Sequence, residues 1–233
     1  MPITPEEFNE RLSALREELH EQGRRARRLA QTTFDAFIQH DPEQAREAIR
    51  LDDEIDEVDV DLERRLVELL VEAAREAISL DERPIRGALT LVKVNNEFER
   101  IADAGVSIAH NTIAMPEATD AFPPTARVMT NSVVGMLRDI AKAYGERDAS
   151  LARLVLQSED IVGAFKQEIL RQAERQVASG AMSVDVAFHL HELANACTLM
   201  ADHATNIAEQ VIYDATGAIV RHMEGHWVLD DLK

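Results

Sequence analysis

The sequence predicts an all-α protein built as two tandem three-helix bundles related by internal duplication. Its 233 residues include only 9 glycines and 7 prolines, whereas a strand-rich fold needs many turns made of these residues. The helix formers Ala, Leu, Glu and Arg are abundant, and apolar residues make up 45% of the chain, enough for a substantial core. Two similar segments also recur in the same order in each half, which is typical of a duplicated unit.

Three long helices are expected in the first half. Thr4-Pro5 followed by two glutamates is a helix-start signal, and the first helix should run to about residue 38, where His40-Asp41-Pro42 breaks it. Asp41 caps a second helix, whose apolar residues recur every three or four positions over about eight turns. The stretch Leu80–Pro84 ends that helix, and a third should span about residues 84–114.

The only loop-like stretch, around Met115-Pro116 and Phe122-Pro123-Pro124, predicts a linker. We therefore expect a first bundle over residues 1–117 and a second bundle with a C-terminal tail over residues 118–233. Helices in the second half are expected over about 125–144 and 149–178, and from a cap at Ser183 to about 215. The single Trp227 in the tail is expected to pack against the bundle.

The duplication rests on two alignments. Ile101–Ala109 and Met200–Ala208 share Ala, Asp, Ile and Ala in register at an offset of 99 residues (101 to 200). Ala45–Asp56 aligns with Ala152–Gly163 at an offset of 107 residues (45 to 152). Because both matches fall on the second and third helices of each half, and in the same order, a duplicated three-helix unit is the interpretation they favour.

The formal net charge of −18 argues against nucleic acids and anionic membranes as partners and favours cations. The one compact basic cluster, Arg24–Arg28, is interpreted as a solvated helix face. Met1–Glu10 is acidic and lacks the apolar core of a signal peptide, and no apolar run is long enough to span a bilayer. With a single cysteine as well, the sequence predicts a cytoplasmic protein that reaches membranes only through a partner.

Pairs of acids four residues apart lie on the duplicated segments: Asp52 with Asp56, and Glu99 with Asp103. This spacing puts both carboxylates of a pair on one helix face, so two packed helices could present four carboxylates to one cation. Oxygen ligands suit Mg²⁺, Mn²⁺ and iron. A chain with 43 acids also produces such pairs by chance, so a solvated acidic face is the alternative interpretation.

The second half keeps only part of this set. Glu159 and Asp202 occupy the positions equivalent to the first and last acids of the first half, but Gly163 and Thr198 replace the other two. His203 and Glu209 are possible substitutes, although His203 is expected at the bundle surface. Asn206 is expected to cap or bridge helices.

The segment Ala201–Tyr213, ADHATNIAEQVIY, closely resembles the last helix of PhoU proteins, which carries a Glu-Arg-Ile-Gly-Asp-His-Ala-Thr-Asn-Ile-Ala-Glu signature. Glu99–Asp103, ERIAD, resembles the same signature with Ala in place of Gly, and Asp52–Asp56 resembles the acidic motif of the family's second helix. The resemblance covers nearly the whole chain. One departure is the Pro-x-x-x-Asp-Leu-Arg stretch before the third helix, where Ala88 and Thr90 replace the Asp and the Arg.

The resemblance implies a fold of two spectrin-repeat-like bundles in a cytoplasmic, often dimeric regulator of phosphate homeostasis that is not an enzyme. It also implies partners, namely a phosphate ABC transporter and a membrane histidine kinase. The acidic motifs of the family can hold iron, zinc or other metals, and the sequence leaves iron, zinc, manganese and magnesium open. On this pattern the first-half ligands would be Asp52, Asp56, Glu99 and Asp103, and the remnant of the second set would be Glu159 and Asp202.

Two other functions share this fold class. A ferritin-like di-metal enzyme needs Glu-x-x-His on two helices, and only Glu17 to His20 has that spacing here. A helical scaffold without metal has the same periodicity as a metal-binding regulator, so the pattern of apolar residues does not distinguish the two.

Overall fold

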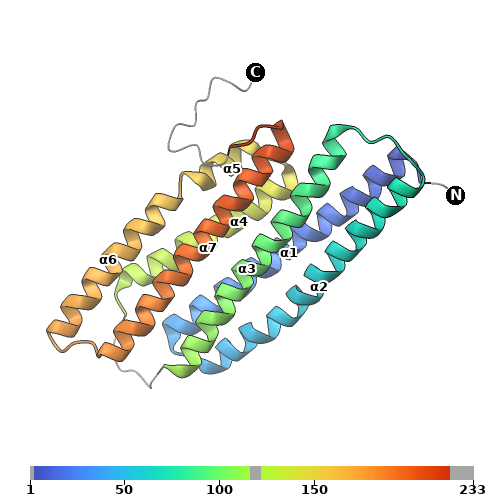
Figure 1. Ribbon diagram of the computed structural model, residues 1–233. Helices are drawn as coiled ribbons and strands as arrows, with labels where there is room; N and C mark the ends of the chain where they lie inside the picture. The colour runs from blue at the N-terminus through green and yellow to red at the C-terminus, as the bar shows by residue number, and fades with distance from the viewer. Residues whose placement is uncertain (1–2, 116–121, 221–233) are drawn as a thin grey trace.

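The computed structural model describes residues 3–115 and 122–220, and within these ranges it holds seven α-helices and no strand. The all-α prediction is therefore confirmed. The helices α1 to α3 form the first half and α4 to α7 the second (Figure 1). Their bounds are α1 Pro5–Gln39, α2 Pro42–Arg75, α3 Glu82–Ala114, α4 Pro124–Glu146, α5 Ala149–Leu156, α6 Glu159–Ala178 and α7 Val184–Thr216.

Side-chain caps set several of the helix starts, as the sequence predicts. The Thr4 hydroxyl accepts a hydrogen bond from the backbone N–H of Glu7 at 3.2 Å, and the Asp41 carboxylate accepts from the first turn of α2. The Ser183 hydroxyl does the same for α7. At the end of α1, His40 adopts a left-handed conformation with φ 54°, and Pro42 then begins the next helix. The predicted break at residues 40–42 is confirmed.

The prediction of a single helix over residues 149–178 is wrong, because Gln157 and Ser158 interrupt it and separate α5 from α6. The backbone N–H of Ser158 bonds to the carbonyl of Val155, three residues back, which tightens the last turn. The Ser158 hydroxyl donates to the Leu154 carbonyl at 2.9 Å and takes the acceptor that a continuing helix would use. Together α5 and α6 fill the place that α2 holds in the first half.

The two halves share one hydrophobic core. Contacts join α1 to α4 and α3 to α7, so the third helix of one half lies beside the last helix of the other (Figure 1). One cluster of buried apolar side chains runs from Phe8 on α1 through Phe98 on α3 to Ile212 on α7. The predicted boundary between residues 117 and 118 lies outside the described residues, as does Trp227, so both stay predictions.

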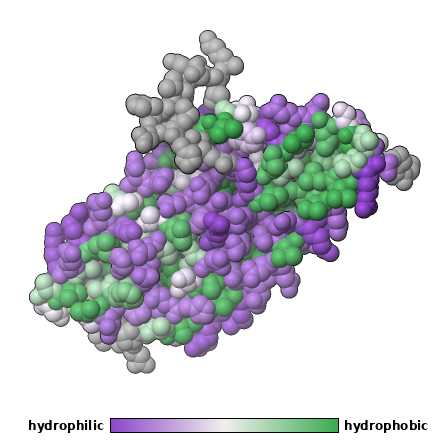
Figure 2. Space-filling view, in the orientation of Figure 1, coloured by the Kyte–Doolittle hydropathy of each residue, from purple (hydrophilic) through white to green (hydrophobic). Residues whose placement is uncertain are grey.

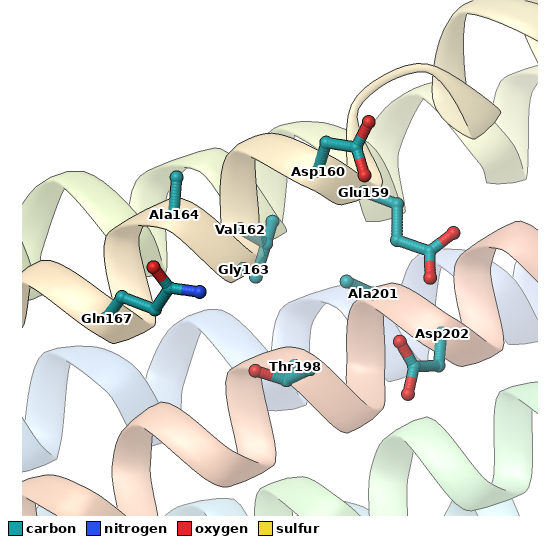
Figure 3. Close-up of a pocket in the computed structure, with 9 residues that line it drawn as sticks. All are labelled: Glu159, Asp160, Val162, Gly163, Ala164, Gln167, Thr198, Ala201 and Asp202. Atoms are coloured by element: carbon teal, nitrogen blue, oxygen red, sulfur yellow. The ribbon is translucent and has the colours of Figure 1, made fainter. Parts of the chain in front are cut away.

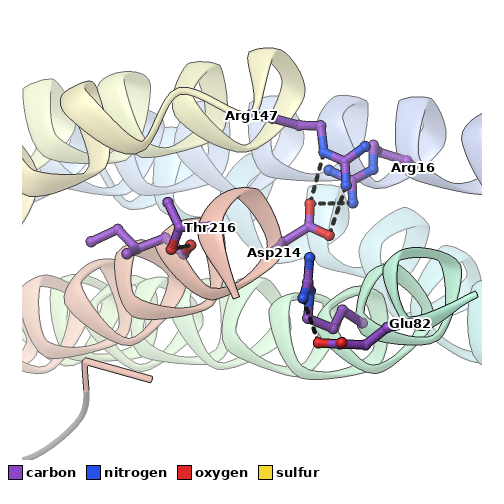
Figure 4. Close-up of polar contacts among 7 residues, drawn as sticks. Arg16, Glu82, Arg147, Asp214 and Thr216 are labelled. Carbon is purple, nitrogen blue, oxygen red and sulfur yellow. Dashed lines mark hydrogen bonds and ion pairs between the residues drawn. The ribbon is translucent and has the colours of Figure 1, made fainter. Parts of the chain in front are cut away.

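A buried ion cluster joins α1, α7 and the end of α4 across the two halves (Figure 4). The Asp214 side chain on α7 is 2% exposed and accepts a hydrogen bond from Arg16 Nη2 on α1 at 2.6 Å. Arg147, which follows α4, donates to the same carboxylate through Nε at 3.0 Å and Nη2 at 2.9 Å. This carboxylate therefore sets the position of α7 against both α1 and the end of α4. Across residues 3–115 and 122–220, no helix combines the length and the apolar character needed to cross a bilayer.

Candidate metal site

The carboxylates predicted on α2 and α3 act on one another in the folded protein. Partial burial, followed by the charges of Asp56 on the same helix and Asp103 on α3, raises the pKa of Asp52 to about 6. Because the charge of Asp103 reaches Asp52 across the helix pair, the two acidic motifs face each other. The structure thus brings together residues that the sequence separates by about fifty positions.

Glu99 completes this group. Its burial, then the charge of Asp103 and a side-chain hydrogen bond with it, raises the pKa of Glu99 to about 7, with smaller contributions from Asp59 and Asp56. Every charge that acts on Asp52 or Glu99 in this way is negative. Among the described residues, therefore, no basic side chain offsets the charge on Asp52 or Glu99, and the oxygen donors of this face suit a hard or borderline cation.

Asp59 is a fifth carboxylate of this face that the sequence analysis missed. It lies three residues after Asp56 on α2, and burial, together with the charges of Glu63 and Asp56, raises its pKa. Asn95 on α3 donates to the Asp59 carboxylate at 2.7 Å and to its backbone carbonyl at 3.0 Å, which fixes the side chain against α3. The signal that would have found it is the continuation of the 52, 56 spacing by one further turn on the same face.

In the second half, a pocket lies where the first half has two of its four carboxylates. It has a volume of about 340 Å³ and lies between α6 and α7, where Gly163 and Thr198 line it from opposite sides (Figure 3). The two remaining acids, Glu159 and Asp202, lie at one end. Burial and the charge of Asp202 raise the pKa of Glu159, and burial raises that of Asp202 although His203 and Lys166 oppose it. A side chain at Gly163 would meet no atom within 4 Å of its Cβ.

His203 does not lie at the bundle surface, so that prediction is wrong. It is 7% exposed, and its Nδ1 lies 2.7 Å from Oε2 of Glu97 on α3. Asn206 donates to the same oxygen at 3.2 Å, which confirms that it bridges helices. Burial alone would raise the pKa of Glu97, but the hydrogen bonds from His203 and Asn206 hold it below its usual value. His203 therefore joins the two halves, because its Nδ1 contacts Glu97 and not the predicted ligands Glu159 and Asp202.

The PhoU domain matches two segments of this chain, residues 19–112 and 126–211, and together these make up more than half of it. The chain belongs to the PhoU family. The matched segments correspond to the two halves of the fold, so the predicted duplication agrees with two PhoU domains. Membership also agrees with the prediction of a regulatory protein that is not an enzyme.

Relatives and solved structures extend this assignment. The "phosphate-specific transport system accessory protein PhoU homolog" of Aquifex aeolicus is 31% identical over 211 residues, covering 88% of this chain and 93% of the relative. The protein of the same name from Zymomonas mobilis is 28% identical over 215 residues, covering 92% and 89%. The crystal structure of PhoU from Pseudomonas aeruginosa superposes with a TM-score of 0.82 at 23% identity, covering 91% of this chain and 100% of that one, and supports the fold alone.

Three side chains with possible metal-ligand atoms lie close together elsewhere in this PhoU chain. Among the described residues, only Glu17, His20 and Glu21 have His, Cys, Asp or Glu ligand atoms that all lie within 4.8 Å of one another. All three lie on one turn of α1, and the Glu17 side chain is 74% exposed. A ferritin-like centre needs such a motif on two helices, so this trio does not form one. The acids between α2 and α3 must rotate their side chains to enclose an ion.

Proposed function

We propose that this PhoU-family chain is a cytoplasmic regulator of phosphate uptake and phosphate-starvation signalling. In this role it is a metal-binding adaptor between a phosphate ABC transporter and a sensor histidine kinase, and it forms a homodimer. The observation that carries the proposal is the PhoU match over both halves, supported by relatives named as phosphate-specific transport accessory proteins.

The proposed metal ligands are the four first-half carboxylates: Asp52, Asp56, Glu99 and Asp103. The support for this assignment is electrostatic. Partial burial and then the charges of neighbouring acids raise the pKa values of Asp52 and Glu99, and one multivalent cation would stabilise their ionised forms. Iron, zinc, manganese and magnesium all accept carboxylate oxygens. When bound, the ion would supply the positive charge that draws α2 and α3 together. In the second half, Glu159 and Asp202 are the remnant of a second set, with too few donors for a comparable site.

An exposed apolar surface supports the adaptor role. Figure 2 shows apolar side chains gathered over the C-terminal half of α2 and the first turns of α3. Large apolar patches on a protein surface mark sites of interaction with other proteins. We assign the binding of protein partners to this α2–α3 surface, which consists of Val60, Val67, Leu70, Val71, Ile85, Leu89 and Val92, with exposures from 39% to 66%.

The regulatory role is tested by deletion and complementation. Deleting the gene is expected to raise phosphate uptake and starvation-gene expression, and normal repression in the deletion strain would overturn the proposal. Complementation with Val67→Asp plus Leu89→Asp should leave repression defective while the melting temperature stays unchanged. Val184→Asp is the matched control, because Val184 is 70% exposed but lies on α7, away from the α2–α3 surface.

The metal site is tested by elemental analysis of freshly purified protein. Asp56→Ala with Asp103→Ala should remove most of the bound metal, whereas the control Asp139→Ala, a partly exposed acid on α4, should retain it. Gly163→Asp with Thr198→Glu restores two carboxylates where the pocket leaves space and should raise the metal-to-protein ratio. Equal metal content in wild type and the alanine pair would refute the ligand assignment.

A further inference from the structure

A second pocket, of about 320 Å³, opens where the two halves meet. One face of α1 lines it with Ser13 and Arg16, the start of α3 lines it with Asp81, Arg83 and Gly87, and Arg147 closes it from the end of α4. Three arginines thus surround one hollow in a chain whose net charge is −18. Neither the proposed metal site nor the α2–α3 surface accounts for this concentration of positive charge.

The charges around this arginine pocket do not balance. Arg16 and Arg147 share the single Asp214 carboxylate, which takes one hydrogen bond from Arg16 and two from Arg147 (Figure 4). Arg83 is exposed and makes no ion pair within the described part of the chain. Three guanidinium groups set against Asp81 and Asp214 leave an excess of one positive charge. Each guanidinium carries five N–H donors, so donors remain after Asp214 is satisfied.

Backbone N–H groups at this pocket, like the arginines, favour an anionic ligand. The α3 helix begins beside the pocket, and the Asp81 side chain makes no capping hydrogen bond. The N–H groups of Glu82 and Arg83 therefore lack a side-chain acceptor, and Pro84, which follows them, has no N–H. Gly87 lines the pocket, and a Cβ there would make ordinary van der Waals contacts with Leu12 at 3.4 Å and with Arg16 Nη2 at 3.7 Å, so glycine leaves that space to a ligand. Arg16 also stacks over the buried ring of Tyr144, with its Cζ 5.2 Å from the ring centroid, which holds the guanidinium in place.

We propose that this arginine pocket binds a phosphate-class oxyanion, either as the free ion or as the phosphoryl group of a larger molecule. Arg83, Arg16 and Arg147 supply charge-assisted hydrogen bonds, and the uncapped start of α3 supplies backbone N–H donors. The bound anion contacts α1, α3 and the end of α4, so it strengthens the junction between the halves. The inference stands apart from the proposed metal site, because the two sites share no residue.

Calorimetric titration of the full-length, metal-free protein with inorganic phosphate at constant ionic strength tests the proposal, with ATP as a second titrant. Arg83→Gln removes an exposed charge and should weaken binding about tenfold, the effect of losing one hydrogen bond to a charged group. Ser13→Glu places a carboxylate at the pocket and should abolish binding; it should also raise the melting temperature without added anion. Arg138→Gln, an exposed arginine on α4, is the matched control and should bind like wild type.

The two titrants separate the sources of the phosphoryl group. Binding of inorganic phosphate that weakens in Arg83→Gln supports the free ion, and binding of ATP alone with the same loss supports a phosphoryl group on a larger molecule. Absence of binding by both titrants overturns the proposal. Equal affinity in wild type, Arg83→Gln and Ser13→Glu also overturns it, because the anion would then bind elsewhere. Neither result would affect the metal measurements, which use other residues.

Discussion

Neutralising Glu99 should stabilise the metal-free protein at alkaline pH, because its ionised carboxylate is partly buried there beside other acids on the face between α2 and α3. The Glu99→Gln substitution removes one negative charge and keeps an amide that can donate to Asp103, its present hydrogen-bond partner. The pKa of Glu99 lies at about 7, above its ordinary value of 4.5. Between these two values the folded protein holds a proton that the unfolded chain has released, so stability falls as pH rises through this window and is constant above it.

The size of the effect follows from the shift. Without screening by solvent, raising the pKa of Glu99 from 4.5 to about 7 would cost the ionised, folded state about 3 kcal/mol. The carboxylate remains partly exposed, and water and salt screen its interactions, so we expect about 1 kcal/mol in solution. For a chain of this length that corresponds to roughly 2–4 °C in melting temperature. Asp52, with its pKa raised from 3.8 to about 6, adds a dependence of the same sign at lower pH.

Thermal unfolding of chelator-treated protein measures this difference. Glu99→Gln should melt above wild type by those few degrees near pH 8 and match it near pH 5, where Glu99 is protonated in the folded state. Glu57→Gln, an exposed acid on the same helix pair, should match wild type at both pH values. With metal the sign reverses, because the ion needs ionised ligands and stabilises wild type more as pH rises. Equal melting temperatures for Glu99→Gln and wild type near pH 8 would refute the reasoning.

Three further substitutions test the packing between helices. Asp214→Asn leaves two guanidinium groups without their carboxylate and should cost about 3–5 kcal/mol in urea unfolding. Asp139→Asn, at a partly exposed acid on α4, should stay within about 0.5 kcal/mol. Glu97→Gln should lower stability by about 1–2 kcal/mol at neutral pH. Because the pKa of Glu97 is held low, its carboxylate contributes its full stability above the ordinary value of 4.5, and this contribution is lost as pH falls below that value. Wild type and Glu97→Gln should therefore have nearly equal melting temperatures near pH 3. Gly23→Ala puts a Cβ 2.5 Å from the Phe98 ring and should cost about 1–3 kcal/mol, while Gly135→Ala, with no atom within 4 Å, should stabilise by about 0.5–1 kcal/mol; melting temperatures in the opposite order would contradict the packing.

The parts of the fold that local chemistry determines could be predicted from the sequence. Thr4, Asp41 and Ser183 cap helices through hydrogen bonds to backbone groups two or three residues away, so the residues themselves mark the starts. The break before α6 could not be found in this way. Ser158 is compatible with a helix interior, and only its bond to the Leu154 carbonyl and the tightened turn around it end α5.

The candidate site likewise has a part that the sequence predicts and a part that depends on contacts between helices. The pairing of Asp52 with Asp56 and of Glu99 with Asp103 follows from helical spacing within one element. The role of Asp59 depends on Asn95, which approaches from α3, and the burial of His203 depends on Glu97 from the other half. These contacts arise where α2 packs on α3 and α3 on α7, and periodicity within one helix carries no information about which side chains meet across such an interface.

The difference between the two halves favours a function for the acidic face. The second half forms its helical bundle with Gly163 and Thr198 at positions where the first half has carboxylates, so the fold does not need four acids there. The first half nevertheless holds acids whose pKa values reach about 6 and about 7, because partial burial and then the charges of neighbouring acids disfavour their ionised forms. Packing does not require this destabilising charge. A cation that binds between α2 and α3 gives a physical reason for its presence. The same reasoning predicts that the second half, which keeps only Glu159 and Asp202 of its set, binds metal weakly.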